Sequence, residues 1–398
     1  MKIEQLKIKN YKVFKETEIH DLPNMCVFLG ANGTGKSTLF DVFGFLSDSL
    51  KSNVKSAINK RGGYSEVISR EQQGDIEFEI KFRNEPLDSK KQPLVTYKLK
   101  VGLKDGKPIV NNEVLSYRRG GKGYGAPWKF LDFSQGKGMA IVNEEEYGKE
   151  GAQEKREEQI LDSKDILAIK GLGQFQKFKA ISEFRRILDD WFVSNFNISS
   201  ARTIQDIGLS EHLSTSGDNL ALVAQYIYQN HREIFNKILE KMKQRVPGVS
   251  NVEAKETEDG RIVLRFQDGT FKDPFIARYV SDGTLKMFAY LILLYDPTPH
   301  PLLCVEEPEN YLHPELLLEL AEEFRSYANR GGQVFVSTHS PDFINALNIE
   351  ELFWLTKKEG FTTISRAKDD EVIKSLIDNG DKLGYLWKQS YLKGSGPK

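Results

Sequence analysis

The nine-residue stretch GANGTGKST, residues 30–38, constrains the fold of this chain more than any other feature. It satisfies the spacing G-x-x-x-x-G-K-[ST] and lies between an apolar run at residues 25–29 and apolar residues that recur at helical spacing. In a strand–loop–helix unit of this kind the backbone N–H groups point inward, so the loop cradles phosphates. The sequence therefore predicts a phosphate loop whose contacts come from Gly30, Asn32, Gly33, Gly35, Lys36, Ser37 and Thr38.

Two adjacent carboxylates, Glu306 and Glu307, end a second apolar run in the C-terminal third of the chain. A solvated loop start would explain them, but a phosphate loop also needs groups that complete a metal shell and orient an attacking water. We expect Glu306 and the Ser37 hydroxyl to hold Mg²⁺, and Glu307 to polarise the water. Lys36 would reach the β- and γ-phosphates.

A helix-forming segment from Pro314 to about Arg330 follows, and then the strand-like run QVFVST. A strand, a helix and a second strand of these lengths predict a βαβ crossover and hence a parallel sheet. His339 lies just after the second strand, at the sheet edge where open α/β folds bind ligands. We interpret it as a γ-phosphate contact, although a single histidine often has only a structural role.

Upstream of the paired acids, Ser281, Asp282 and Gly283 precede a segment at residues 284–295 that is apolar almost all round. The pattern predicts a buried helix with a capping turn. A cap alone would explain the turn. A Ser-x-Gly at the N-terminus of a buried helix is also a good anion site, so Ser281 and Gly283 are candidate nucleotide contacts.

Composition allows an ordinary soluble protein of one large α/β unit or of two or three domains. The 398 residues are 39% hydrophobic and 28% charged, with no apolar run long enough to span a membrane and no secretory pattern at the N-terminus. We therefore expect a cytoplasmic protein. Cys26 and Cys304 lie in apolar runs and indicate buried thiols. The net charge of −1 indicates neither a nucleic-acid-binding nor a membrane-binding protein.

Between the two halves, alternating runs from about residue 75 to 142 predict an antiparallel β lobe with KDGK as a hairpin turn. Residues 143–158 are highly charged and predict a mobile loop, and residues 181–196 and 219–246 show helical periodicity. We expect residues 1–143 and 251–398 to form the main body, and residues 144–250 to form a charged loop and a helical insertion. The insertion either contacts a partner or buttresses the sheet.

The segment SYRRGGKGYGAPWK, residues 116–129, interleaves basic and aromatic residues and contains no acid. This pattern suits nucleic-acid backbones and stacked bases, although a solvated hairpin tip explains it equally simply. The residues concerned are Arg118, Arg119, Lys122 and Lys129 with Tyr117, Tyr124 and Trp128.

Taken together, four motifs resemble those of the ABC-type ATPase heads in the SMC, RecF and OLD-nuclease group. GANGTGKST resembles their Walker A motif, VSDGTLK their signature loop, LLCVEEPENYLHP their Walker B motif with its D-loop, and VFVSTHSP their H-loop. The resemblance covers residue 1 to roughly residue 355. It is closest to compact AAA-family ATPases of prokaryotic, antiphage-type operons, whose C-terminal pattern the segment KLGYLWKQSYL also resembles.

The resemblance implies an α/β P-loop NTPase with a parallel-sheet core, an antiparallel β lobe and a helical insertion. In that family two heads sandwich two ATP molecules, so Ser281 and Gly283 would act on the nucleotide held by Lys36 of the other head. It further implies ATP as substrate, Mg²⁺ as cofactor, and Lys36, Glu307 and His339 as the catalytic residues. Glu306 departs from the aspartate of many relatives, and Gln174 is the candidate for the Q-loop glutamine.

The resemblance also implies an ATP-dependent homodimer or higher oligomer and a separately encoded effector, a nuclease or toxin, in antiphage defence. Nucleic acid is a possible further partner, and no membrane contact is expected. Sustained heptads are absent, and only about 59 residues follow the H-loop, so we expect neither a coiled-coil arm nor a nuclease domain. The alternatives are an ATP-gated scaffold with negligible turnover and a RecF-like DNA repair ATPase. A transporter cassette fits less well, because VSDGTLK departs from the transporter form.

Overall fold

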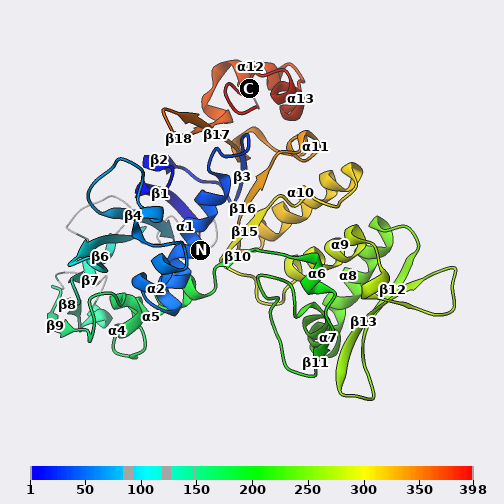
Figure 1. Cartoon of the computed structure of the whole chain (residues 1–398), viewed down its shortest axis with the longest axis horizontal. Coiled ribbons are helices and arrows are strands. Elements are labelled where there is room, and N and C mark those ends of the chain that lie inside the picture. Colours follow the sequence, from blue (N-terminus) through cyan, green and yellow to red (C-terminus); the bar gives the residue numbers. More distant parts are fainter. Residues whose placement is uncertain are drawn as a thin grey trace.

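The computed structural model describes residues 2–83, 94–118, 127–146, 149, 151 and 153–396. A mostly parallel sheet forms the centre of the molecule (Figure 1). The neighbouring strands β10, β15, β16, β3 and β17 run parallel to one another, and β18 pairs with β17 in the antiparallel sense. In sheet order the described strands are β10 (Phe192–Val193), β15 (Leu302–Glu306), β16 (Gln333–Thr338), β3 (Met25–Leu29), β17 (Leu352–Lys358) and β18 (Phe361–Arg366).

The central strands are buried on both faces, which explains why their sequences are continuous apolar runs. Alternate residues of these strands enter two different hydrophobic cores. Cys26 and Cys304 belong to the core that contains α1 (Lys36–Lys51), whereas Val27 and Val305 belong to the core that contains α9 (Asp282–Leu294) and α10 (Pro314–Asn329). Both thiols are buried and free, as the sequence predicts.

A second, antiparallel sheet packs against α1 through the first core. Its β5–β6 hairpin turns at Asp105 and Gly106, which both have positive φ angles, so KDGK is the predicted tight turn. In sheet order the described strands are β2 (Phe14–His20), β1 (Lys2–Tyr11), β4 (Ile76–Arg83), β5 (Leu94–Lys104), β6 (Lys107–Arg118), β7 (Trp128–Ser134), β8 (Lys137–Ile141) and β9 (Arg156–Ile160).

The edge strand β9 corrects one expectation, because residues 143–158 were predicted to be a loop throughout. The short 3-10 helix η1 (Glu144–Glu146) follows β8, and residues 156–158 then pair with β8. An edge strand is held by backbone hydrogen bonds and keeps one side in solvent, so it needs few apolar residues. Low apolar content was therefore a poor signal for a loop here.

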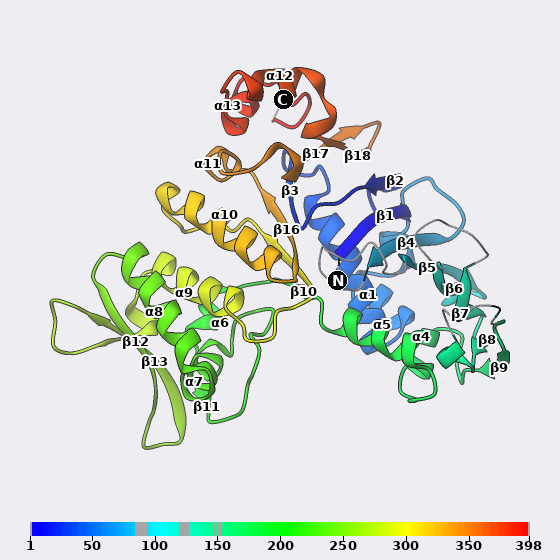
Figure 2. The same cartoon turned by 180° about the vertical axis from the view of Figure 1, so that it is seen from behind.

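A third unit surrounds the buried helix α9 and lies on the other side of the parallel sheet (Figure 2). The run RIVLRFQD forms β13 in a small antiparallel sheet of this unit, not in the central sheet. The periodic segment at residues 219–246 forms two helices that meet at His231. The described elements are α6 (Ile198–Ala201), β11 (Gln205–Asp206), α7 (Leu220–Asn230), α8 (Arg232–Arg245), β12 (Val249–Glu256), β13 (Arg261–Asp268), β14 (Phe275–Ile276) and η2 (Ala277–Tyr279).

Residues 144–250 are divided between the two cores. The helices α4 (Ala168–Leu172) and α5 (Lys179–Asp189) pack in the first core, whereas α7 and α8 pack with α9 in the second. The helix predicted over residues 181–196 ends at Asp189, and the chain continues as β10 of the central sheet. The expected domain boundaries stay a prediction.

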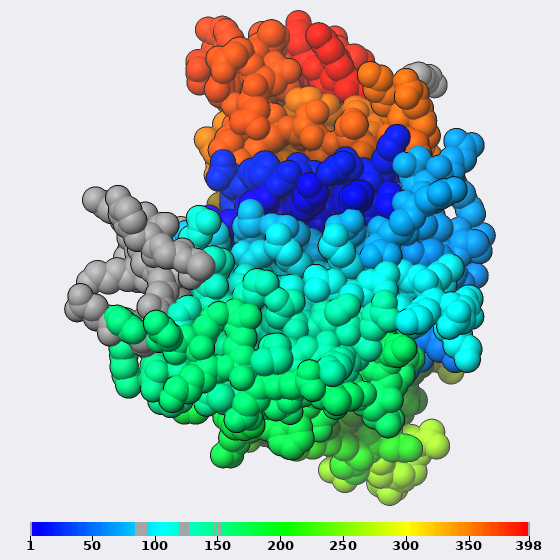
Figure 3. Space-filling model, turned by 90° about the vertical axis from the view of Figure 1, so that its left-hand side faces the viewer, coloured from blue at the N-terminus to red at the C-terminus, as the bar shows by residue number. Residues whose placement is uncertain are grey.

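The C-terminal segment covers one end of the central sheet and packs on Leu29, Leu352 and Trp354. In the space-filling view, the N-terminal strands form a dark blue band between this orange and red segment and the cyan and green antiparallel lobe (Figure 3). The remaining described helices are α2 (Val54–Asn59), α3 (Tyr64–Val67), α11 (Pro341–Ile344), η3 (Ile349–Glu351), η4 (Ala367–Asp369), α12 (Glu371–Asp378) and α13 (Leu383–Lys388). Within the described ranges, no helix has the length and apolar character needed to cross a bilayer.

Candidate nucleotide site

The phosphate loop joins the carboxyl end of β3 to the N-terminus of α1, as the sequence predicts. Gly35 precedes α1 with a φ of 102°, and a Cβ atom there would lie 2.8 Å from Val13 Cγ2. A Cβ on Gly30 would lie 2.9 Å from the Leu355 carbonyl oxygen. The tight packing leaves no room for side chains at these two positions. The first N–H groups of α1 have no partner inside the helix and are available to an anion.

Lys36 is buried at the base of the loop, where its Nζ donates to the Gly30 carbonyl at 2.6 Å. Burial lowers the pKa of Lys36, and the nearby carboxylates Glu307, Glu309 and Glu306 oppose that shift. A positive charge is thus held beside the backbone amides of the loop. This is the electrostatic environment that a polyphosphate requires.

Ser37 and Glu306 meet although 269 positions separate them in the sequence. The Ser37 hydroxyl donates to Glu306 Oε2 at 2.5 Å, and β16 lies between the strands that deliver the two residues. A hydroxyl and a carboxylate are hard oxygen ligands of the kind that Mg²⁺ prefers. Because both oxygens converge at the mouth of the phosphate loop, these residues fit a Mg²⁺ ion.

The backbone of Glu307 is left-handed, with a φ of 42°. Its N–H donates to the Ser337 carbonyl at 2.8 Å, which fixes the peptide against β16. Its carboxylate lies 3.1 Å from His339 Nδ1 through Oε1, and Oε2 accepts from Asn310 Nδ2 at 3.1 Å. A non-glycine residue in this conformation is uncommon, and such residues cluster at functional sites.

His339 is held in place by a residue that sequence reasoning missed. Glu309 Oε1 accepts from the Thr338 hydroxyl at 2.8 Å and from the His339 backbone N–H at 2.9 Å. The Glu309 side chain is only 8% exposed, whereas the His339 ring is 48% exposed. Glu309 therefore anchors the backbone, and the imidazole remains accessible beside Glu307. The only sequence signal for Glu309 is its place two residues after the paired acids.

The predicted signature turn caps α9, and its Ser281 Oγ accepts from the Thr284 N–H at 3.2 Å. Ser281 itself lies at the surface. A Cβ atom on Gly283 would lie 2.6 Å from the Tyr311 carbonyl oxygen, so the turn rests directly on the segment that follows the paired acids. Arg202 donates to the Asp282 carboxylate and to carbonyls of the preceding segment, which fixes the turn from the other side.

Lys286, in the first turns of α9, connects the signature turn to the same segment. Its Nζ donates to the Asn310 carbonyl at 2.8 Å and to the Glu307 carbonyl at 3.3 Å, and it lies 5.4 Å from the ring centre of Tyr290. The residue is only 6% exposed, and burial lowers its pKa to about 8. The buried ammonium group thus fixes the backbone at Glu307 and at Asn310, in the segment that follows the paired acids. In the sequence, a single lysine in an apolar helix pattern was its only sign.

Gln174 is not brought to this site. It follows α4, where its side chain donates to the Lys170 carbonyl, and no interaction links it to the phosphate loop within the described ranges. The structure therefore does not support it as the Q-loop glutamine.

The basic and aromatic segment is only partly described, since Arg119, Lys122 and Tyr124 lie outside the described residues. Tyr117 and Trp128 are buried on adjoining strands and pack on Phe130. These two rings cannot stack with nucleic-acid bases without leaving the core, so the base-stacking interpretation is wrong for them.

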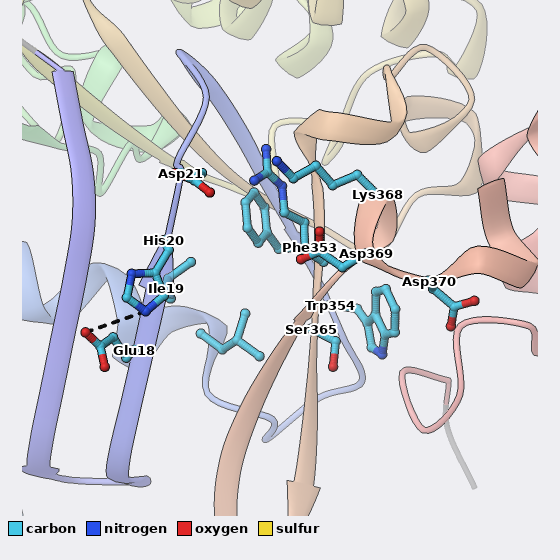
Figure 4. A pocket seen from close by; sticks show the side chains of 12 residues that line it. Glu18, Ile19, His20, Asp21, Phe353, Trp354, Ser365, Lys368, Asp369 and Asp370 are labelled. Carbon is cyan, nitrogen blue, oxygen red and sulfur yellow. Dashed lines mark ion pairs between the residues drawn. The ribbon is translucent and has the colours of Figure 1, made fainter.

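A pocket of about 470 Å³ lies between the end of β2 and the β17–β18 hairpin (Figure 4). His20 and Asp21 face Phe353, Lys368 and Asp369 across it. None of the candidate nucleotide residues lines this pocket. It is a separate feature of the surface.

Comparison with known proteins supports the resemblance deduced from the motifs. Residues 25–345 match the family AAA_21, described as "AAA domain, putative AbiEii toxin, Type IV TA system". A search of curated proteins gave no match. Among solved structures, an SMC head bound to the C-winged helix domain of ScpA matches with a TM-score of 0.55 and 16% identity, covering 94% of this chain and 100% of that chain.

Two further SMC heads match more weakly. The SMC head domain from Thermotoga maritima has a TM-score of 0.46 and 14% identity, over 92% of this chain and 99% of that one. An SMC head with an extended coiled coil, bound to the C-terminal domain of ScpA derived from Pyrococcus furiosus, has a TM-score of 0.48 and 14% identity, over 95% and 99%. The predicted ABC-type, SMC-like P-loop fold is confirmed. Since the family match spans more than half of the chain, this protein belongs to the AAA_21 family of ATPase domains.

Proposed function

We propose that this protein is a Mg²⁺-dependent ATPase that dimerises around ATP and couples that closure to an effector. The contact between Ser37 and Glu306 is the observation that carries the proposal. It joins the phosphate loop to an acid from a distant strand, with Glu307 and His339 beside it. A phosphate-binding loop that served only as a structural turn would not need these groups at one sheet edge.

In this proposal the phosphate loop binds the triphosphate, and Lys36 exchanges its bond with the Gly30 carbonyl for bonds to phosphate oxygens. Ser37 and Glu306 would hold Mg²⁺, which when bound neutralises charge on the β- and γ-phosphates. Glu306 is one methylene longer than aspartate. The Glu306 carboxylate accepts a hydrogen bond from Ser37, which supports the same metal-binding role for the longer acid.

Glu307 is the proposed general base. Its carboxylate takes a proton from the water that attacks the γ-phosphorus, and ADP leaves as the P–O bond breaks. Asn310 and His339 each hold one carboxylate oxygen, so the base is oriented before substrate arrives. His339 would also donate to the γ-phosphate, and the exposure of its ring supports that role.

Ser281 and Gly283 are proposed to contact the nucleotide of a second head. The surface position of Ser281 at the N-terminus of α9 supports this role, because the helix end favours an anion. Lys286 acts as a positioning residue that links the signature turn to the backbone around Glu307. A second head that contacts the signature turn of the first head would thereby affect the position of Glu307, the general base of the first head.

We further propose that the effector is a separately encoded nuclease or toxin and that the system serves antiphage defence. The description of the family as a putative toxin of a type IV TA system supports a two-component arrangement. An SMC head with this fold was solved bound to a ScpA domain, which supports a protein partner for this head as well.

Steady-state ATP hydrolysis by the full chain with Mg²⁺, compared with the Glu307→Gln variant, tests the enzyme proposal. Loss of turnover with retained ATP binding is expected, and removal of Mg²⁺ should also abolish turnover. Glu315→Gln is the matched control, since that carboxylate is exposed in the same region of the chain. Equal, negligible turnover in wild type and Glu307→Gln, with ATP still bound, would favour the ATP-gated scaffold. Stimulation by duplex DNA would instead favour a RecF-like ATPase.

Dimerisation is tested by complementation between two inactive variants. Lys36→Ala removes ATP binding from one head, and Ser281→Arg blocks the signature turn of the other. A mixed dimer contains one intact composite site only if the signature turn acts on the opposite head. Recovery of hydrolysis on mixing is expected, and a mixture as inactive as its components would contradict action between heads.

A further inference from the structure

A cluster of two histidines and one aspartate lies at the opposite edge of the central sheet from the phosphate loop. Asp296 and His300 belong to the connection between α9 and the amino end of β15, and His212 comes from the loop between β11 and α7. One candidate ligand atom from each residue lies within 4.8 Å of the other two. None of the three takes part in the proposed nucleotide site.

His300 has the hydrogen-bonding pattern of a metal ligand. Its Nδ1 lies 2.9 Å from the Asp190 carbonyl oxygen, an acceptor, so this nitrogen carries the proton. The other nitrogen, Nε2, therefore carries a free lone pair. It is buried and has no hydrogen-bond partner in the described part of the chain. Histidines that bind metals characteristically donate their second ring N–H to a carbonyl or carboxylate, which fixes the tautomer and the ring orientation.

Asp296 is also oriented and buried. Its Oδ1 accepts from the Thr298 N–H at 2.8 Å, and its Oδ2 lies 2.8 Å from His212 Nδ1. The His212 side chain is 44% exposed, whereas that of Asp296 is only 2% exposed. The buried carboxylate therefore has one fixed oxygen, and the more accessible imidazole can adjust to complete a coordination shell.

We propose that His212, Asp296 and His300 bind one divalent transition-metal ion of the Zn²⁺ class. Two imidazole nitrogens and one carboxylate are a ligand set of zinc sites, whereas Mg²⁺ prefers oxygen ligands alone. Three protein ligands leave a fourth position for water or another donor. The unpartnered His300 Nε2 is the atom that this assignment explains.

The bound ion would join the loop before α7 to the connection between α9 and β15. His300 packs 5.0 Å from Phe192 and bonds to Asp190, which follow α5, whereas His212 belongs to the loop that leads into α7. Metal binding would tie this long loop to the base of the central sheet. Because the ion binds the folded chain and the cluster is not assembled in the unfolded one, it would raise the stability of the fold.

The test is Zn²⁺ binding by the full chain after removal of metals with a chelator and in excess Mg²⁺. Calorimetry gives stoichiometry and affinity, Co²⁺ in place of Zn²⁺ gives a visible absorption spectrum, and thermal unfolding with and without Zn²⁺ gives the change in Tm. The variants are His212→Asn, Asp296→Asn and His300→Gln. His20→Gln, which removes an exposed histidine elsewhere, is the matched control.

One Zn²⁺ per chain, a higher Tm with Zn²⁺ and imidazole-type Co²⁺ absorption are expected. Loss of any of the three ligands should weaken binding at least about 100-fold, since loss of second-shell partners alone weakens metal sites about 10- to 100-fold. His212→Asn alters an accessible ring, so an unchanged metal-free Tm in this variant separates lost coordination from misfolding.

Two results would overturn the proposal. One is the absence of Zn²⁺ binding by the wild type, which would leave a simple Asp–His hydrogen bond. The other is binding that survives in His212→Asn and His300→Gln but disappears in His339→Asn, because the ion would then occupy the nucleotide site. No readout depends on ATP hydrolysis, so failure here and failure of the proposed ATPase are distinguishable.

Discussion

Replacing Lys286 by methionine should raise the stability of the protein at neutral pH and lower its ATP turnover. Lys286 is a buried cation that holds the carbonyls of Glu307 and Asn310. Methionine has a similar length and fills the same space without a charge. The substitution therefore separates the energetic effect of burying the ammonium group from its effect on the catalytic segment.

The magnitude follows from the pKa of Lys286, which burial lowers from 10.5 to about 8. At 1.36 kcal/mol per pKa unit, the protonated side chain destabilises the fold by about 3 kcal/mol at pH 7. Loss of two hydrogen bonds to carbonyls offsets about 2 kcal/mol of the gain. The variant should thus be more stable by about 1 kcal/mol at pH 7, although breaking most buried polar contacts destabilises a protein.

The sign of the pH dependence distinguishes this explanation from better packing. Between about pH 8 and pH 10.5 the unfolded chain binds a proton at Lys286 and the folded chain does not, so wild-type stability rises by about 1.36 kcal/mol per pH unit. The variant lacks this contribution. Its stability advantage should therefore disappear and reverse as the pH rises from about 7 to about 9.5.

Urea unfolding at both pH values measures these differences, with Lys137→Met as the matched control at an exposed ion pair. In the hydrolysis assay, a displaced Glu307 should lower kcat by up to about 100-fold while KM for ATP stays nearly constant. A variant that is several kcal/mol less stable and has the wild-type pH dependence would refute the buried-charge argument. An unchanged kcat would refute the positioning role.

Three further predictions concern Glu113, Gly283 and Arg245. Burial raises the pKa of Glu113 to about 7, so the free energy of unfolding of the wild type should fall by about 3 kcal/mol as pH rises from about 4.5 through 7. Urea unfolding of Glu113→Gln should not show this fall, and identical pH profiles for the two proteins would contradict the assignment. Gly283→Ala would place Cβ 2.6 Å from the Tyr311 carbonyl oxygen, so ATP hydrolysis should fall while fluorescent ATP analogues still bind. A variant that hydrolyses ATP at the wild-type rate would exclude this close contact. Arg245→Met removes one of the polar partners of Glu323, which keeps Lys241 and Tyr295, and should destabilise the fold by about 1–3 kcal/mol; an unchanged Tm would contradict this prediction.

Local sequence patterns were sufficient for much of the fold. The phosphate loop, the βαβ crossover to His339, the capped helix α9 and the β5–β6 hairpin all lie where spacing and turn residues predict them. These features depend on backbone preferences and on alternation within a few residues, so neighbouring residues specify them. The edge strand β9 was missed because backbone pairing to β8, not its own composition, makes it a strand.

The distribution of the middle segment could not be deduced in the same way. The helices α5 and α8 each bury an apolar face, yet they pack in different cores. An apolar helix face indicates that a helix is buried but does not identify what covers it. The two interpretations of the insertion from sequence, a partner contact and a buttress of the sheet, stay predictions.

The residue types of the candidate nucleotide site were determined by the sequence alone, since the order Lys36, Ser37, Glu306, Glu307 and His339 already indicated the chemistry proposed for them. Only the tertiary structure decided how they meet. Parallel strands bring their carboxyl ends to one edge, which closes the distance between Ser37 and Glu306 and turns Glu307 toward His339. The supporting groups, Lys286 and the His212 cluster among them, were invisible in sequence because contacts across the chain, and not spacing along it, define them.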